Sequence, residues 1–97
     1  MIRHVVLFKF KSGIDWNDPR AVAAERTAAK VGSEVPEVSE WRYGRNVSAR
    51  DIAYDFLVEG LLDDMEKVDS YLVHPFHQEA IRQWREISEW VMVDVEV

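Results

Sequence analysis

The stretch RHVVLFKFK, residues 3–11, constrains the fold of this chain more than any other segment. Its β-branched and aromatic residues favour a strand, in which successive side chains point to opposite faces of a sheet. One face would carry His4, Val6, Phe8 and Phe10, and the other would carry Val5, Leu7 and Lys9. Because both faces are apolar at the centre of the strand, we expect other parts of the protein to cover both.

A helix pattern follows this strand. Asp18 before Pro19 is typical of a helix start, with a capping carboxylate and then a proline at the first helical position. The segment after it is rich in alanine, and such small side chains suit close packing on a sheet. We expect Gly32 and Pro36 to end this helix.

A proline divides the second helical region. Asp63 or Asp64 would cap a helix that ends at His74, because Pro75 disfavours helical geometry in the residue before it. Another helix can start at Pro75 and run to about Ser88. Apolar residues recur at helical spacing around the first helix, at Leu61, Met65, Val68 and Leu72. The residues expected to face inward in the second helix are Phe76, Ala80, Trp84 and Ile87.

Three more strands complete the pattern, from Val38, over residues 52–60 and over residues 90–97. The order is β-α-β-β-α-β, which predicts one α+β domain of the ferredoxin-like type over residues 1–97. Such a sheet has helices on one face and leaves the other bare. Large apolar side chains are expected on that bare face: Phe8, Phe10, Tyr54 and Phe56. Since a monomer rarely exposes so large an apolar patch, we expect a homodimer with its two sheets face to face.

Composition limits the classes of function. The net charge is −6, whereas nucleic-acid binding needs a basic face, so we expect no nucleic-acid partner. No apolar run approaches the roughly 20 residues that cross a bilayer, and the first residues do not form a signal peptide, so no membrane partner is expected. The chain has no cysteine, which excludes disulfides and thiolate chemistry and fits the reducing cytoplasm.

The segment YLVHPFH, residues 71–77, holds the strongest candidates for chemistry. His77 borders the buried stripe of its helix, where an imidazole can act as a general base near neutral pH or simply bond a backbone carbonyl. Tyr71 would meet it only if the break at Pro75 turns the second helix back, and its phenol could then stabilise a developing oxyanion. His74 is expected to bond backbone at the break. A metal site is not expected, because the His-x-x-His spacing spans the break and no third ligand is apparent.

The first and third strands add further candidates. His4 shares a face with Val6, Phe8 and Phe10, so it is either a polar point in an apolar cavity or a core histidine beneath the helices. We favour the cavity. The residues expected to bind a small apolar molecule there are His4, Phe8, Tyr54 and Phe56.

Four segments together resemble one protein family. RHVVLFKFK, WRYGRNVS, AYDFLVEG and YLVHPFH occur in the order and spacing of the stress-responsive dimeric A/B-barrel (Dabb) family, and the Tyr-x-x-His-Pro-x-His signature is specific to it. The resemblance covers nearly the whole chain. It implies ferredoxin-like protomers that join their sheets into a barrel with a cavity.

The resemblance also implies a chemistry. In polyketide cyclases of the olivetolic acid cyclase type, which close a polyketide by a cofactor-free aldol condensation, the signature's tyrosine and last histidine are the catalytic pair. They correspond to Tyr71 and His77, and a pocket histidine of the first strand corresponds to His4. Phe56 stands where those enzymes have another pocket histidine, so the resemblance does not extend to the same substrate. The alternatives are a non-catalytic stress-response protein that binds a ligand or partner, and a cofactor-free monooxygenase.

Overall fold

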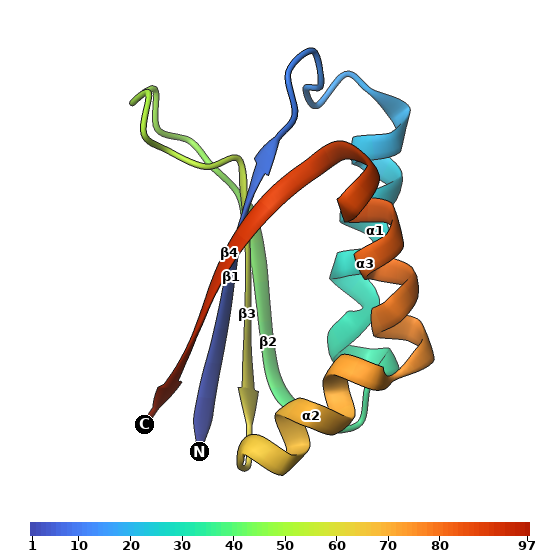
Figure 1. Ribbon diagram of the computed structural model, residues 1–97, viewed down its shortest axis with the longest axis vertical. Coiled ribbons are helices and arrows are strands. Elements are labelled where there is room, and N and C mark those ends of the chain that lie inside the picture. Colours follow the sequence, from blue (N-terminus) through green and yellow to red (C-terminus); the bar gives the residue numbers. More distant parts are fainter.

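The computed structural model describes residues 1–97 and has a four-stranded sheet with all its helices on one face (Figure 1). The elements in chain order are β1 (Ile2–Phe10), α1 (Pro19–Glu34), β2 (Val38–Arg45), β3 (Phe56–Leu62), α2 (Met65–Val73), α3 (Pro75–Ile87) and β4 (Ser88–Glu96). The strand order is β2-β3-β1-β4, and every neighbouring pair is antiparallel. The predicted α+β ferredoxin-like fold is therefore confirmed.

The start of α1 is as predicted, but its end is not. The carboxylate of Asp18 accepts a hydrogen bond from the backbone N–H of Arg20, and Pro19 is the first helical residue. Gly32 lies within the helix and does not end it. A Cβ at this position would lie 2.5 Å from the Cβ of Trp41 on β2, so glycine is needed here for close packing of helix on strand.

The helix break at Pro75 is confirmed. Asp64 caps α2 by accepting a hydrogen bond from the backbone N–H of Lys67. His74 has extended backbone angles, φ −62° and ψ 134°, and is the only residue between α2 and α3. Its Nδ1 accepts a hydrogen bond from the N–H of Phe76 at 3.1 Å, so His74 caps α3 at the junction, as expected.

The third strand begins four residues later than predicted, at Phe56. Asp55 precedes it and ties the loop to the end of β1: its N–H donates to the carbonyl of Phe8, and its carboxylate accepts from the N–H of Phe10. Ile52 and Ala53 lie in a turn and not in the sheet. Residues 46–55 therefore form a loop between β2 and β3.

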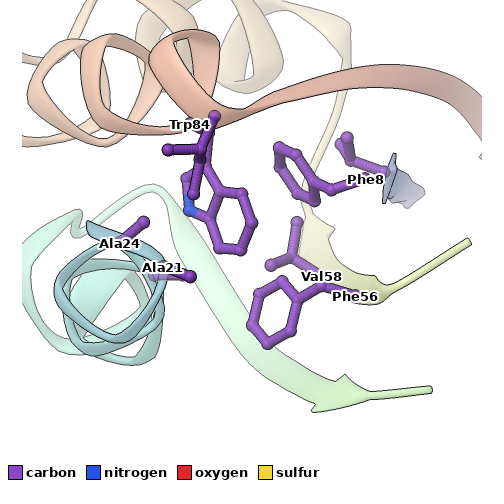
Figure 2. Packing of buried hydrophobic residues seen from close by; sticks show 9 residues of the cluster. Phe8, Ala21, Ala24, Phe56, Val58 and Trp84 are labelled. Carbon is purple, nitrogen blue, oxygen red and sulfur yellow. The ribbon is translucent and has the colours of Figure 1, made fainter. Parts of the chain in front are cut away.

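The helices cover the opposite face of β1 from the one predicted. Val6 and Phe8 are buried beneath the helices, and they lie opposite Val58 and Phe56 of β3 in the sheet register. Figure 2 shows Phe8, Phe56 and Val58 on the sheet side of Trp84, with Ala21 and Ala24 of α1 on its other side. Small alanines leave room for the indole, so the bulky aromatic residues belong in this layer and not on the bare face.

The bare face carries the aliphatic residues of the other alternation. Leu7 and Val91 are opposite each other in the register, as are Val5 and Val93. The apolar side chains of Leu7, Val91, Val93 and Val95 are all exposed. An apolar bare face thus exists as predicted, but it is made by residues other than Phe8, Phe10 and Phe56. No helix in the structure has the length and apolar character needed to cross a membrane.

Candidate functional site

A cavity of about 230 Å³ lies between the sheet and the helices. The strands supply His4, Val6 and Phe8 of β1 and Trp90 and Met92 of β4 to its wall. The helices close it with side chains of α1, α2 and α3. The lining is apolar except at His4, Tyr71 and His77, so a few polar groups converge in an otherwise hydrophobic space, as in small-molecule sites.

His77 lies in the first turn of α3 and is oriented by the end of α2. Its Nδ1 is 3.2 Å from the carbonyl oxygen of Leu72. Since a carbonyl can only accept, Nδ1 carries the proton and Nε2 is left with a free lone pair. Burial lowers the pKa of His77 to about 4, although the hydrogen bond to Leu72 favours the charged ring. The ring is therefore neutral at neutral pH.

Tyr71 lies in the last turn of α2 and packs against this histidine. The centroids of the two rings are 4.0 Å apart. Only 2% of Tyr71 is exposed, and burial raises the pKa of its phenol, with a further increase from the negative charge of Asp94. The phenol therefore keeps its proton over the whole physiological range and can act only as a neutral hydrogen-bond donor.

His4 completes the group from the sheet side. Its ring stands edge-on to that of Tyr71, with centroids 5.3 Å apart. Its Nδ1 is 2.5 Å from Oδ1 of Asp94, which lies opposite it on β4. His4 therefore lies beneath the helices, on the face that was not favoured from the sequence, and it lines the cavity that the sheet and the helices enclose there.

Asp94 was missed in the analysis of the sequence, although a signal was present. Trp90, Met92 and Asp94 share one face of β4, because side chains two residues apart point the same way. That face turns toward the cavity, so a carboxylate on it requires a partner. The register between β1 and β4 supplies His4 as that partner.

Of the other predicted site residues, one lines the cavity and the rest lie elsewhere. Phe8 lines the cavity together with His4, Tyr71 and His77. Phe56 does not: it is buried in the aromatic core, with its ring centroid 4.8 Å from that of Trp84. Tyr54 lies in the loop before β3, where the ammonium of Lys9 sits 5.6 Å from its ring centroid. His74 and Pro75 form the helix junction.

No group of three or more histidine, cysteine or acidic side chains has the arrangement of a metal site. The polar groups of the cavity are instead two imidazoles and a phenol, with one carboxylate behind His4. Such a set can transfer a proton and donate a hydrogen bond to an oxygen.

Comparison with known proteins gives a match over almost the entire chain. The family model described as "Stress responsive A/B Barrel Domain" (Dabb) matches residues 2–97. An uncharacterised protein of Streptomyces coelicolor is 38% identical over 96 residues, which is 99% of each chain.

Solved structures of similar fold include proteins of different descriptions. A dimeric ferredoxin-like protein of unknown function from Thermobifida fusca has a TM-score of 0.86 at 23% identity, covering 99% of this chain and 90% of its own. A hydroxynitrile lyase from Passiflora edulis has a TM-score of 0.82 at 15% identity, covering 99% and 92%. At these identities the likeness concerns the fold alone.

Proposed function

This chain belongs to the stress-responsive A/B barrel domain family, and from that premise we propose that it is a cofactor-independent enzyme acting on a small apolar carbonyl compound. The reaction class is an aldol-type carbon–carbon bond formation in the cavity between sheet and helices. His77 is the general base, and Tyr71 donates a hydrogen bond to the oxyanion. A homodimer is the assembly that carries the site.

One observation supports this proposal more than any other: a neutral imidazole with a free Nε2 packs against a phenol that keeps its proton, inside an apolar cavity. A base and an oxyanion donor must be adjacent to act on neighbouring atoms of one substrate. Burial holds both groups in the protonation states that these roles need.

The steps of the proposed aldol reaction use His77 and Tyr71 in turn. His77 Nε2 removes a proton from the carbon next to a carbonyl, and the electron pair of that C–H bond moves toward the carbonyl oxygen as an enolate. Tyr71 stabilises this oxygen by a hydrogen bond. The enolate carbon then attacks a second carbonyl of the same molecule, and the new alkoxide takes the proton back from His77.

His4 and Asp94 have a supporting part in this proposal. Asp94 accepts a hydrogen bond from Nδ1 of His4, which fixes the orientation of the imidazole on the cavity wall. His4 would form a hydrogen bond with a polar group of the substrate, and Asp94 is a positioning residue that acts through it. Their place on adjacent strands gives the pair a rigid support.

The hydroxynitrile lyase among the similar structures is consistent with this class of chemistry. A cyanohydrin is cleaved to a carbonyl compound and cyanide when a base removes the hydroxyl proton and the C–C bond breaks. That reaction, like the aldol step, combines removal of a proton by a base with a change in a C–C bond at a carbonyl carbon. The supporting likeness is one of fold, so the substrate of this chain is a separate question.

A second candidate is binding without turnover. The lowered pKa of His77, about 4, makes its imidazole a weak base once it is in the cavity. An apolar cavity with three polar groups can also hold a small ligand unchanged. This candidate and the enzyme use the same cavity, so one assay can separate them.

The bare face supports the dimer. Leu7, Val91, Val93 and Val95 expose a contiguous aliphatic surface on neighbouring strands β1 and β4. Burial of apolar area stabilises an association by about 25 cal/mol per Å² before the costs of assembly are counted. A second copy presents the same aliphatic surface, which suits the packing of sheet on sheet across a two-fold axis.

The test of the enzyme is deuterium exchange into the methyl group of acetophenone in D₂O, followed by proton NMR. Acetophenone is an apolar ketone with exchangeable hydrogens next to its carbonyl. We expect the protein to accelerate exchange, and His77→Gln to remove the acceleration by roughly 100-fold or more. Tyr71→Phe should lower the rate by roughly 10- to 1,000-fold. Lys30→Gln, a change at an exposed position of α1 outside the cavity, is the control that should keep the rate.

Three outcomes are distinct. Loss of exchange in both cavity variants with unchanged circular dichroism supports the enzyme. Exchange by His77→Gln at the wild-type rate contradicts it. Binding of acetophenone by the wild-type protein without any exchange favours the ligand-binding candidate.

A further inference from the structure

The loop between β2 and β3, residues 46–55, stands away from the rest of the protomer. Figure 1 shows it on the side of the sheet opposite the helices, beyond the end of the strands. Val47 is 99% exposed and Ile52 is 73% exposed, so its own chain provides no apolar cover for these two side chains. This segment is called the arm below.

The arm is built as an ordered structure. At its base the N–H of Asn46 donates to the carbonyl of Asp55, and Asp55 is bonded to β1 at Phe8 and Phe10. Further along, the side-chain amide of Asn46 bonds both backbone groups of Ser48. Its oxygen accepts a hydrogen bond from the N–H of Ser48, and its nitrogen donates one to the carbonyl of Ser48. An ordered loop loses little conformational entropy when it docks on a partner, which favours binding.

A hollow lies where the arm meets the bare face. It has a volume of about 580 Å³, and its lining includes Asn46 and Tyr54 of the arm and Leu7 and Leu57 of the bare face. The side chains of the chain itself leave this hollow open. It joins the arm and the bare face into one surface, which a single partner would cover.

We propose that the arm grips a second copy of this chain, with Val47 and Ile52 packed against the partner protomer. The inference rests on the homodimer of the proposed function and adds a surface that the sheet faces do not include. The arm projects to the side on which the partner's sheet would lie (Figure 1). In a two-fold dimer each protomer contributes one arm, so the contact occurs twice.

The partner's identity follows from the same geometry. The arm and the aliphatic bare face point to the same side of the molecule, and the partner that covers that face is the one the arm can reach. The charges of Arg50 and Asp51 balance each other at the tip of the arm, and its third charged residue, Asp55, lies at the base and is bonded to Phe10. An apolar tip without net charge suits an apolar protein surface and not a phosphate-rich one.

The test compares dimer dissociation constants by sedimentation equilibrium. Val47→Ser combined with Ile52→Ser should weaken the dimer roughly tenfold or more, because two exposed aliphatic side chains would no longer be buried on association. The control is Val73→Ser, since Val73 is also 73% exposed but ends α2 in the helix layer. Its dissociation constant should equal that of the wild type.

A second measurement is independent of affinity. The chain contains no cysteine, so Val47→Cys and Val73→Cys each introduce a single thiol. A maleimide should label the thiol at position 47 more slowly in concentrated, dimeric protein than in dilute protein, and the thiol at position 73 at the same rate in both.

The outcomes separate the arm from the dimer. An unchanged dissociation constant in the arm double variant, together with dissociation by Val93→Glu on the bare face, would overturn the arm and leave the dimer standing. A wild-type protein that is monomeric at all concentrations would overturn both. Tenfold weakening confined to the arm variants, with unchanged circular dichroism, supports the arm.

Discussion

The ring of His77 is neutral mainly because it is buried, and the neighbouring His4 and His74 make smaller contributions that also lower its pKa. Burial is the largest cause of its lowered pKa, and its hydrogen bond to the Leu72 carbonyl acts in the opposite direction. A desolvated imidazole keeps its lone pair at neutral pH, which a general base requires. The cost of this arrangement is sensitivity to acid.

That sensitivity is testable. The pKa of His77 is about 4 in the folded protein and 6.5 for an ordinary histidine, so between these values the unfolded chain binds the extra proton. The free energy of unfolding should therefore fall as the pH drops from 6.5 toward 4, by on the order of 2–3 kcal/mol from this group. ¹⁵N NMR of the histidine rings checks the titration directly.

The matched control for this prediction is His77→Gln, which has no titrating ring. Urea unfolding at both pH values should show a smaller loss of stability in the variant than in the wild type. A ring that titrates near 6.5, or an equal loss in both proteins, would contradict the account of His77.

At the scale of single residues, the sequence predicts which side chains are candidates for the site better than it predicts which of them contact one another. The pairing of Tyr71 with His77 depends on how two helices meet at one residue, His74, and helical spacing carries no information across that break. Asp94 pairs with His4 through strand register, which is set by the whole sheet. Tyr54 was expected in the cavity as part of the third strand, which begins two residues after it, whereas Phe56 lies in that strand but was assigned to the wrong face of the sheet.

At the scale of elements, the contact between α1 and β2 depends on a single missing side chain. Gly32 lies in the helix directly against Trp41, whose indole N–H donates to the carbonyl of Ala28 in the same helix. The Cβ of Trp41 is fixed to the backbone of β2, so it cannot swing away from a new methyl group. The strand itself would have to move.

Gly32→Ala should therefore destabilise the protein, although alanine is the better helix former. Helix propensity favours alanine by about 1 kcal/mol, whereas overpacking costs about 1–3 kcal/mol. We expect a net loss of roughly 1–2 kcal/mol in the free energy of unfolding, measured with urea. Ala23→Gly, at an exposed position of α1, reports the propensity effect alone. A rise in stability on Gly32→Ala would contradict the packing argument.

The elements themselves were largely predicted, because caps, prolines and alternation are local signals. Asp18, Asp64 and Pro75 act as the sequence indicates. The face of β1 that the helices cover was predicted wrongly, since both of its faces are apolar and alternation alone cannot distinguish them. Side-chain volume distinguishes the two faces. The large indole of Trp84 packs between the aromatic residues of β1 and β3 on one side and the small alanines of α1 on the other (Figure 2).

At the scale of the whole molecule, the two faces of the sheet have different tasks. The helix side encloses the cavity with Tyr71 and His77, and the bare side carries the aliphatic surface and the arm. The proposed dimer therefore buries the bare side without blocking the cavity, which lies within each protomer. Variants of the arm are expected to change association, and variants of the cavity are expected to change chemistry.

The most direct test of the central proposal is a crystal structure of the protein soaked with acetophenone. We expect electron density for one molecule in the cavity of each protomer, with its carbonyl oxygen within hydrogen-bonding distance of the Tyr71 hydroxyl and its methyl group in contact with Nε2 of His77. Density that lies outside the cavity, or that touches neither of these two side chains, would contradict the proposed site.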